Sequence, residues 1–136
     1  MAFTPKNFEE GRQVILKFST GETVVKYGAV IADTDGYYIM AGSSTAEDIR
    51  YVALQTVTTT ADGQEVLCYE TTGARFIADT DANPARTDVG TYADLASVTT
   101  VNPDASSNDL FYIEDIVGAV ADKKVVGFFT RGVPNS

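Results

Sequence analysis

Short runs of β-branched and aromatic residues, each followed by a turn signal, recur along almost the whole chain. The first run is Val14–Phe18, whose odd and even residues face opposite sides because side chains alternate along a strand. Ser19–Glu22 then supplies a turn, and Thr23–Tyr27 resumes the apolar run, which together indicate a hairpin. This pattern restricts the chain to short strands joined by tight turns.

The same pattern continues through the rest of the sequence. Asp33–Gly36 and Asp62–Gly63 place Asp and Gly where turns need side-chain caps and positive φ. Further strands are predicted at Ala29–Ala32, Tyr37–Met40, Ile49–Val57, Gln64–Thr71, Arg75–Ala78, Val98–Val101, Leu110–Glu114, Ile116–Val120 and Val125–Phe129. The predicted fold is all-β, a compact sandwich or barrel of about nine to ten short strands with an N-terminal arm.

Helical signals are few and short. The best candidate is Thr4–Gly11, where Thr4 suits the N-cap, Pro5 the first helical position and Gly11 the C-terminal end. Ser44–Asp48 and Thr91–Leu95 are shorter candidates, the second for a single turn. None is long enough to build a layer of the fold.

The length of 136 residues favours one domain, divided here into residues 1–13 and a single β domain at residues 14–136. The first segment is polar but carries Phe3 and Phe8. In one interpretation it is an arm that anchors the body to a neighbouring subunit through these rings. In the other it folds back as a short helix that plugs its own barrel.

The chain contains no histidine, no tryptophan and a single cysteine, Cys68. Histidine-dependent triads, Cys–His dyads and the common zinc sites are therefore excluded. Cys68 lies in an apolar run and is interpreted as a small buried hydrophobic residue. We expect no enzymatic activity, no catalytic residues, no cofactor and no metal site.

The same five residues, ending in Asp-Thr-Asp, occur twice in the chain, at Ile31–Asp35 and Ile77–Asp81. Either two strands end in similar turns or the chain contains a duplicated half-barrel. An EF-hand loop starting at Asp79 fails because Pro84 occupies the glycine position and Gly90 the glutamate position. The aspartates are therefore interpreted as turn caps.

A net charge of −9 argues against a surface that follows nucleic-acid phosphates. No apolar run approaches the roughly 20 residues that span a bilayer, so no membrane partner is expected. The first residues lack the apolar stretch of a cleaved signal peptide, and a lone cysteine fits synthesis in a reducing cytosol.

Aromatic residues are the best indication of a binding surface. Neighbours along a strand point to opposite faces, so one ring of each adjacent pair can enter the core while the other faces outward. An outward ring meets either another sheet of the same chain or a partner, since aromatic residues are enriched in interface cores. The interface candidates are Phe3, Phe8, Tyr37, Tyr38, Phe128 and Phe129.

The chain resembles the small capsid decoration, or structural cement, proteins of tailed bacteriophages. The resemblance rests on the segment Met1–Gln13, the strand and turn Gly28–Gly36, and the closing hairpin of Ile116–Val120 and Val125–Phe129. It implies a β-rich viral structural protein without cofactors, made in the host cytoplasm and found in the virion on the capsid exterior. It also implies a homotrimer that binds the major capsid protein and stabilises the assembled shell by bridging capsomers.

Two other classes of function stay open at this point. One is a carbohydrate-binding β-module, in which tyrosines would replace the missing tryptophans as stacking platforms. The other is a different virion part, such as a tail-tube, head-completion or fibre module. Addition of the protein to purified heads separates decoration from connector roles, and a glycan array tests carbohydrate binding.

Overall fold

The computed structural model describes residues 3–6, 12–42 and 49–130. These residues form thirteen short strands and two single 3-10 turns, so the predicted all-β class is confirmed. None of the helical turns in this part of the chain is long and apolar enough to cross a membrane. The helix proposed at Ser44–Asp48 lies outside the described residues.

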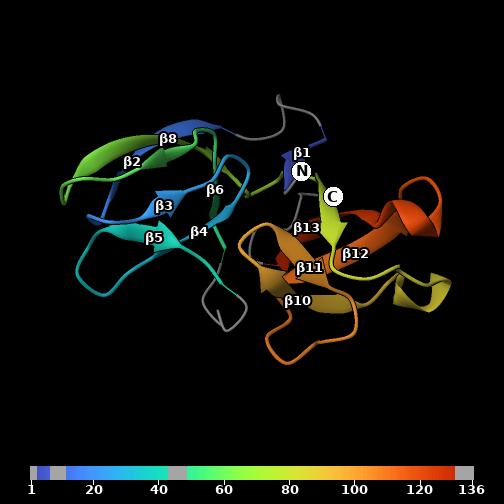
Figure 1. Ribbon diagram of the computed structural model, residues 1–136. Helices are drawn as coiled ribbons and strands as arrows, with labels where there is room; N and C mark the ends of the chain where they lie inside the picture. The colour runs from blue at the N-terminus through green and yellow to red at the C-terminus, as the bar shows by residue number, and fades with distance from the viewer. Residues whose placement is uncertain (1–2, 7–11, 43–48, 131–136) are drawn as a thin grey trace.

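Five strands form a closed first barrel, on the left of Figure 1. Its strand order is β2-β5-β4-β6-β8, and β2 pairs with β8 to close the ring. The pairing of β2 with β5 is parallel and the others are antiparallel. The strands are β2 (Gln13–Phe18), β4 (Ala29–Ala32), β5 (Tyr38–Met40), β6 (Tyr51–Ala53) and β8 (Gln64–Glu70).

The next five strands form a second barrel, on the right of Figure 1. They are ordered β9-β11-β10-β12-β13, and an additional pairing between β9 and β13 joins the two ends into a ring. Only β9 and β11 are parallel. The strands are β9 (Phe76–Thr80), β10 (Tyr92–Ser97), β11 (Thr100–Asn102), β12 (Phe111–Ile116) and β13 (Lys124–Phe129).

The two barrels have the same topology. In each, the strands taken in chain order are arranged 1-3-2-4-5 around the ring, and the parallel pair is the first with the third. The additional elements also fall in the same two connections. In the first barrel these are β3 (Thr23–Val24) and β7 (Val57–Thr58), which pair with each other; in the second they are the 3-10 turns η1 (Arg86–Asp88) and η2 (Val120–Asp122).

The strand order is repeated in the two barrels, but the similar sequence segments Ile31–Asp35 and Ile77–Asp81 do not occupy equivalent places in them. Ile31 lies in β4, the second strand of its barrel, whereas Ile77 lies in β9, the first strand of the other. The two copies therefore occupy positions that are not equivalent. The similarity between these two segments is one of composition, and what the barrels share is the order in which their strands pair.

The described residues form two apolar clusters, a smaller one inside the first barrel and a larger one that contains residues of both barrels. Phe18, Val66 and Cys68 lie in the core inside the first barrel, with the side chains of the flanking positions outside it. Tyr69 faces away from that interior and is nevertheless fully buried, because its ring meets Phe76 of the second barrel at 6.1 Å. The larger core continues from this junction into the second barrel, where its largest side chains are Phe3, Phe76, Phe111, Ile113 and Phe129.

Backbone contacts support the same junction. The Ala29 amide donates a hydrogen bond to the Val98 carbonyl across the two barrels at 2.8 Å. At the adjacent Gly28, a Cβ atom would lie 2.6 Å from the Met40 side chain and 3.1 Å from Val98. The Val25 carbonyl oxygen would lie 3.0 Å from the same Cβ atom, so a larger residue at Gly28 would force its neighbours to shift.

The start of the chain belongs to the body and does not reach away from it at residues 3–6. Strand β1 (Thr4–Pro5) pairs with β9, and the ring of Phe3 is fully buried against Phe111 and Phe129. The helix predicted to begin at Thr4 is therefore wrong, because Thr4 and Pro5 are extended. Within residues 3–6, Phe3 enters the core of its own chain and the following residues form a strand, while residues 7–11 lie outside the described part of the chain.

Other predicted elements also differ from the structure. The predicted hairpin of Val14–Phe18 with Thr23–Tyr27 is wrong, because β2 pairs with β5 and β8 while β3 pairs with β7. Residues 92–97 form β10 where a helical turn was expected at Thr91–Leu95. The expected strand Ile49–Val57 is divided into β6 and β7. Of the expected strand Ile116–Val120, only Ile116 belongs to a strand, as the last residue of β12. The 3-10 turn η2 follows, and Lys123 after it adopts a left-handed conformation.

Candidate functional site

Three aromatic rings form a row on the outer face of the second barrel. Tyr92 of β10 lies directly opposite Tyr112 of β12, which lies directly opposite Phe128 of β13. Their centroids are 5.1 Å apart in both pairs, and Tyr112 stacks on Phe128 with an interplanar angle of 26°. We call Tyr92, Tyr112 and Phe128 the aromatic ladder.

The alternation of the strands explains why these rings face outward. The neighbouring residues Ala93, Phe111 and Phe129 are fully buried in the core, so the intervening positions must point the other way. Tyr92 is 47% exposed, which makes it one of the three most exposed large hydrophobic residues in the described part of the chain. The ladder therefore presents apolar surface to solvent.

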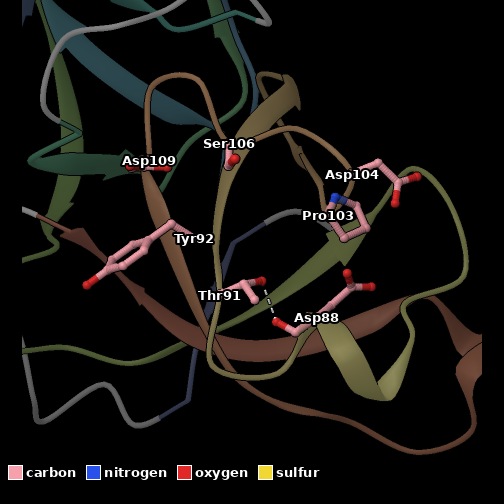
Figure 2. Close-up of a pocket in the computed structure, with 7 residues that line it drawn as sticks. All are labelled: Asp88, Thr91, Tyr92, Pro103, Asp104, Ser106 and Asp109. Carbon is pink, nitrogen blue, oxygen red and sulfur yellow. Dashed lines mark hydrogen bonds between the residues drawn. The ribbon is translucent and has the colours of Figure 1, made fainter.

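A hollow of about 520 Å³ lies beside Tyr92, at the end of the aromatic ladder (Figure 2). Figure 2 shows the Asp88 and Asp104 side chains on one side of it and Tyr92 with Asp109 on the other. It is formed where the start of β10 meets the connection between β11 and β12. The lining residues are Asp88, Thr91, Tyr92, Pro103, Asp104, Ser106 and Asp109.

A buried carboxylate holds this connection in place. Asp94 follows Tyr92 on the same side of β10 and is only 7% exposed. Its two carboxylate oxygens accept hydrogen bonds from the backbone amides of Ser107, Asn108 and Asp109 at 2.7–3.0 Å. Because a charged acceptor strengthens such bonds, the loop that carries the rim of the hollow is fixed before any ligand arrives.

The rim carboxylates form no ion pair with any described residue. Asp88 accepts a hydrogen bond from the Ala85 amide, and Asp104 and Asp109 are exposed. The ion pairs that the structure shows lie elsewhere, at Arg12–Glu70, Arg75–Glu114, Arg86–Asp115 and Lys124–Asp79. The hollow is therefore strongly acidic and has an aromatic wall.

Of the predicted interface residues, those near the ends of the chain divide between core and surface. Phe3 and Phe129 are fully buried and pack on each other with centroids 4.9 Å apart, so they are core residues of this chain and not interface residues. Phe128 is half-buried on the outer face, as expected for the neighbour of a core ring. Phe8 lies outside the described residues.

The Tyr37–Tyr38 pair is placed differently from the expectation. Both side chains are half-buried, and Tyr38 packs at the first-barrel core against Phe18 and Tyr51, with centroids 6.4 and 5.6 Å away. Tyr37 borders the turn, where its amide donates to Asp35. The structure does not bring this pair near the ladder.

The sequence analysis missed Tyr92 and Tyr112. Tyr112 was inside a predicted strand and directly follows Phe111, so the argument from adjacent aromatic pairs applied to it as well, but this pair was not singled out. Tyr92 was hidden by the expected helical turn. The alternation of Ala93 and Leu95 with Tyr92 and Asp94 was the signal that could have revealed a strand with an outward ring.

The Asp-rich segments do not form a metal site in the described part of the chain, where no cluster of three or more ligating side chains is present. Asp33 and Asp35 accept hydrogen bonds from the amides of Thr34 and Tyr37, which confirms them as turn caps. Asp79 lies within β9 and accepts a hydrogen bond from the Lys124 ammonium at 2.6 Å. Its carboxylate is thus neutralised by the ammonium group of Lys124 in the neighbouring strand β13.

Cys68 is buried inside the first barrel, as the sequence predicted. Burial raises the pKa of its thiol to about 12. The thiolate, which is the nucleophilic form, is therefore scarce at neutral pH. Cys68 fills space in the core, and its protection makes it a sensitive reporter of barrel opening.

The acidic hollow and the ladder are thus the most distinctive surface of the described chain. No model of a known protein family, no curated protein and no solved structure matches the sequence or the fold.

Proposed function

We propose that this protein is a non-enzymatic structural component of a virion that binds the outside of an assembled phage capsid and stabilises it by bridging neighbouring capsomers. A bridging protein needs two binding faces on one rigid body. The observation that carries the proposal is the larger apolar cluster, which contains buried residues of both barrels and so joins them, with their separate outer faces, into such a body.

The rigidity of the body matters because a flexible bridge would lose stabilising free energy as it ordered on the shell. Tyr69 and Phe76 are buried at the junction, and the Ala29–Val98 hydrogen bond crosses it. Binding to the assembled shell but not to free capsid subunits stabilises the shell by mass action, and no chemical step is required.

Each barrel offers exposed apolar residues for such contacts. In the first barrel Ile15 on β2 is 62% exposed and lies opposite the half-buried Leu67 of β8. In the second barrel Tyr92 and Val120 are each 47% exposed. The faces lie on different barrels, as a bridge between two capsomers requires.

We further propose that the protein assembles as a homotrimer through the first-barrel face around Ile15. The first barrel is nearly neutral, with six acidic and five basic residues in 12–42 and 49–75. Lys17 and Glu65 lie opposite each other beside Ile15, so copies of this face do not repel strongly. The trimer itself is implied by the resemblance to cement proteins.

The direct test mixes the purified protein with expanded and unexpanded heads of the phage whose genome encodes it. Co-sedimentation and negative-stain images are expected to show added density on expanded heads, and their thermal disruption is expected to occur at a higher temperature. Absence of binding to expanded heads, with the protein folded, contradicts the proposal. Light scattering on the free protein measures its molar mass, and the proposed homotrimer predicts three times the mass of one chain.

A carbohydrate-binding module is a second candidate, favoured by the aromatic ladder beside the hydroxyl and carboxylate groups of the hollow. Exposed rings stack on sugars and carboxylates accept sugar hydroxyls. A glycan array distinguishes the two: specific binding of a neutral glycan, together with no binding to heads, favours the module.

A further inference from the structure

The second barrel combines an apolar row of rings with an acidic hollow on one continuous outer face. Tyr92 belongs to both, since it forms the end of the aromatic ladder and a wall of the hollow. Asp104 and Asp109 lie at the rim and are exposed. We call Tyr92, Tyr112, Phe128, Asp104 and Asp109 the acidic aromatic face.

The charge of this barrel is strongly unbalanced. Residues 76–130 contain nine acidic and three basic side chains. Two of the three cations, Arg86 and Lys124, are already paired with Asp115 and Asp79. The three carboxylates that line the hollow form no ion pair with a described residue, so a cation that enters the hollow would be attracted to uncompensated negative charge.

We propose that the acidic aromatic face binds a lysine- or arginine-bearing segment of a protein partner. This inference rests on the proposed function, in which that partner is the capsid surface. Lysine and arginine suit the face because their aliphatic stems cover apolar rings while their charged ends reach carboxylates. Their charges also interact favourably with the faces of exposed aromatic rings.

Charge complementarity selects this occupant over a second copy of the chain. Another copy carries the same net charge of −9, so the overall repulsion between the two chains opposes its approach. It also selects a basic segment over a neutral sugar, since a sugar brings no positive charge to Asp88, Asp104 and Asp109.

The face is prepared for binding before the partner arrives. Asp94 fixes the loop through three backbone amides, and the Thr91 hydroxyl donates to the Asp88 carbonyl at 2.6 Å. The stacked rings of Tyr112 and Phe128 hold each other in position. Little ordering is therefore needed on binding, which favours affinity.

The test uses capped hexalysine as the probe, titrated into the full-length protein at low ionic strength and followed by amide chemical shifts. The largest shifts are expected at residues 88–94, 103–112 and 128. Asp104→Asn combined with Asp109→Asn, and separately Tyr92→Ala, are each expected to weaken binding about fivefold to tenfold. Added salt is expected to weaken it further.

The matched control is Asp33→Asn combined with Asp35→Asn, which removes the same charge from an exposed turn of the first barrel. Asparagine can still cap that turn, so the fold is expected to be unchanged. If this control variant weakens hexalysine binding by less than about twofold, a local site is supported, because the control loses only part of the general electrostatic attraction between the protein and the probe. An equal weakening by both double variants, or equally strong binding of a neutral oligosaccharide, overturns the inference.

A separate arm distinguishes this inference from the proposed function. Wild-type protein and the Asp104→Asn, Asp109→Asn variant are each mixed with expanded heads. Equal head binding by both overturns the inference and leaves the proposed function standing. No head binding by the wild type, with specific hexalysine binding at the face, overturns the proposed function and leaves the basic-segment site supported.

Discussion

The two barrels share a strand order and differ in what they present to solvent. The first has nearly balanced charge and an exposed aliphatic residue at Ile15, whereas the second has nine acidic residues against three basic ones and an exposed aromatic ladder. Their additional segments occupy the same two connections, but form a small sheet in one and 3-10 turns in the other. One pairing pattern therefore supports two different surfaces.

The comparison shows how the two faces of a strand separate their roles. Inward positions such as Val66 and Cys68 in one barrel, and Phe111 and Phe129 in the other, are fully buried and define the packing. Outward positions are not restricted by that packing, so they can change charge and ring content without changing the topology. The exception is the junction, where the outward side of the first barrel, including Tyr69, is itself buried.

The largest expected effect comes from the junction. Phe76→Ala removes a fully buried ring that contacts both Tyr69 and Phe129. We expect the free energy of unfolding to fall by about 3–5 kcal/mol, measured by urea denaturation. Phe128→Ala is the control, since its ring is half-buried on the outer face and should cost much less. Similar losses in the two variants would contradict the role of the junction.

A smaller but still large effect is expected from Gly127→Ala, which acts on the second barrel. A Cβ atom at this position would lie 1.8 Å from the Tyr112 carbonyl oxygen and 2.8 Å from the Phe111 ring. Separating β12 from β13 should cost about 3 kcal/mol. Gly42→Ala is the matched control, because a Cβ atom there meets nothing within 4 Å, and its thermal transition should be unchanged.

Asp94→Ala is expected to lower the free energy of unfolding by about 2 kcal/mol, since three backbone amides lose a charged acceptor. Amide exchange at Ser107, Asn108 and Asp109 should accelerate more than exchange elsewhere. Asp104→Ala, at the exposed rim, should leave the stability nearly unchanged. Unaltered exchange at the three amides in the Asp94 variant would show that this carboxylate does not hold the loop.

The smallest effect concerns pH. Burial acts to raise the pKa of Asp79, the hydrogen bond and the charge of Lys124 are among the causes that lower it, and the net effect is a lowered pKa. The associated stability is present above the unfolded value of about 3.9 and is lost as the pH falls through the lower folded pKa. Lys124→Gln should therefore cost up to about 1 kcal/mol at pH 7, because the pair is partly exposed. The cost should vanish near pH 2; a difference that persists there would contradict the assignment.

The local signals in the sequence were sufficient for the fold class but not for the topology. Turns such as Asp33–Gly36 are determined by the conformations of a few neighbouring residues, and the structure contains that turn with Gly36 at φ +88°. Closure of each barrel depends instead on pairings between distant segments, such as β9 with both β11 and β13. Such pairings leave no local mark in the chain.

The candidate site was predictable only in part. Phe128 was identified because it is adjacent to a core ring, but its partners in the ladder come from β10 and β12 and meet it only through strand register. Phe3 was expected at a surface because its sequence neighbours are polar. Its burial depends on β1 pairing with β9, more than 70 positions away, which composition does not indicate.

The claim that the barrels form one body is tested most directly by the accessibility of Cys68. Its thiol is buried in the first barrel and has a pKa of about 12, so a thiol reagent reacts after that barrel opens. We would measure labelling of Cys68 in wild type and in Gly127→Ala, whose direct damage is confined to the second barrel. If one cooperative core joins the barrels, labelling should accelerate about a hundredfold in the variant, in proportion to its lost stability. Labelling at the wild-type rate, in a variant whose second barrel is measurably destabilised, would contradict the single body and with it the rigid bridge.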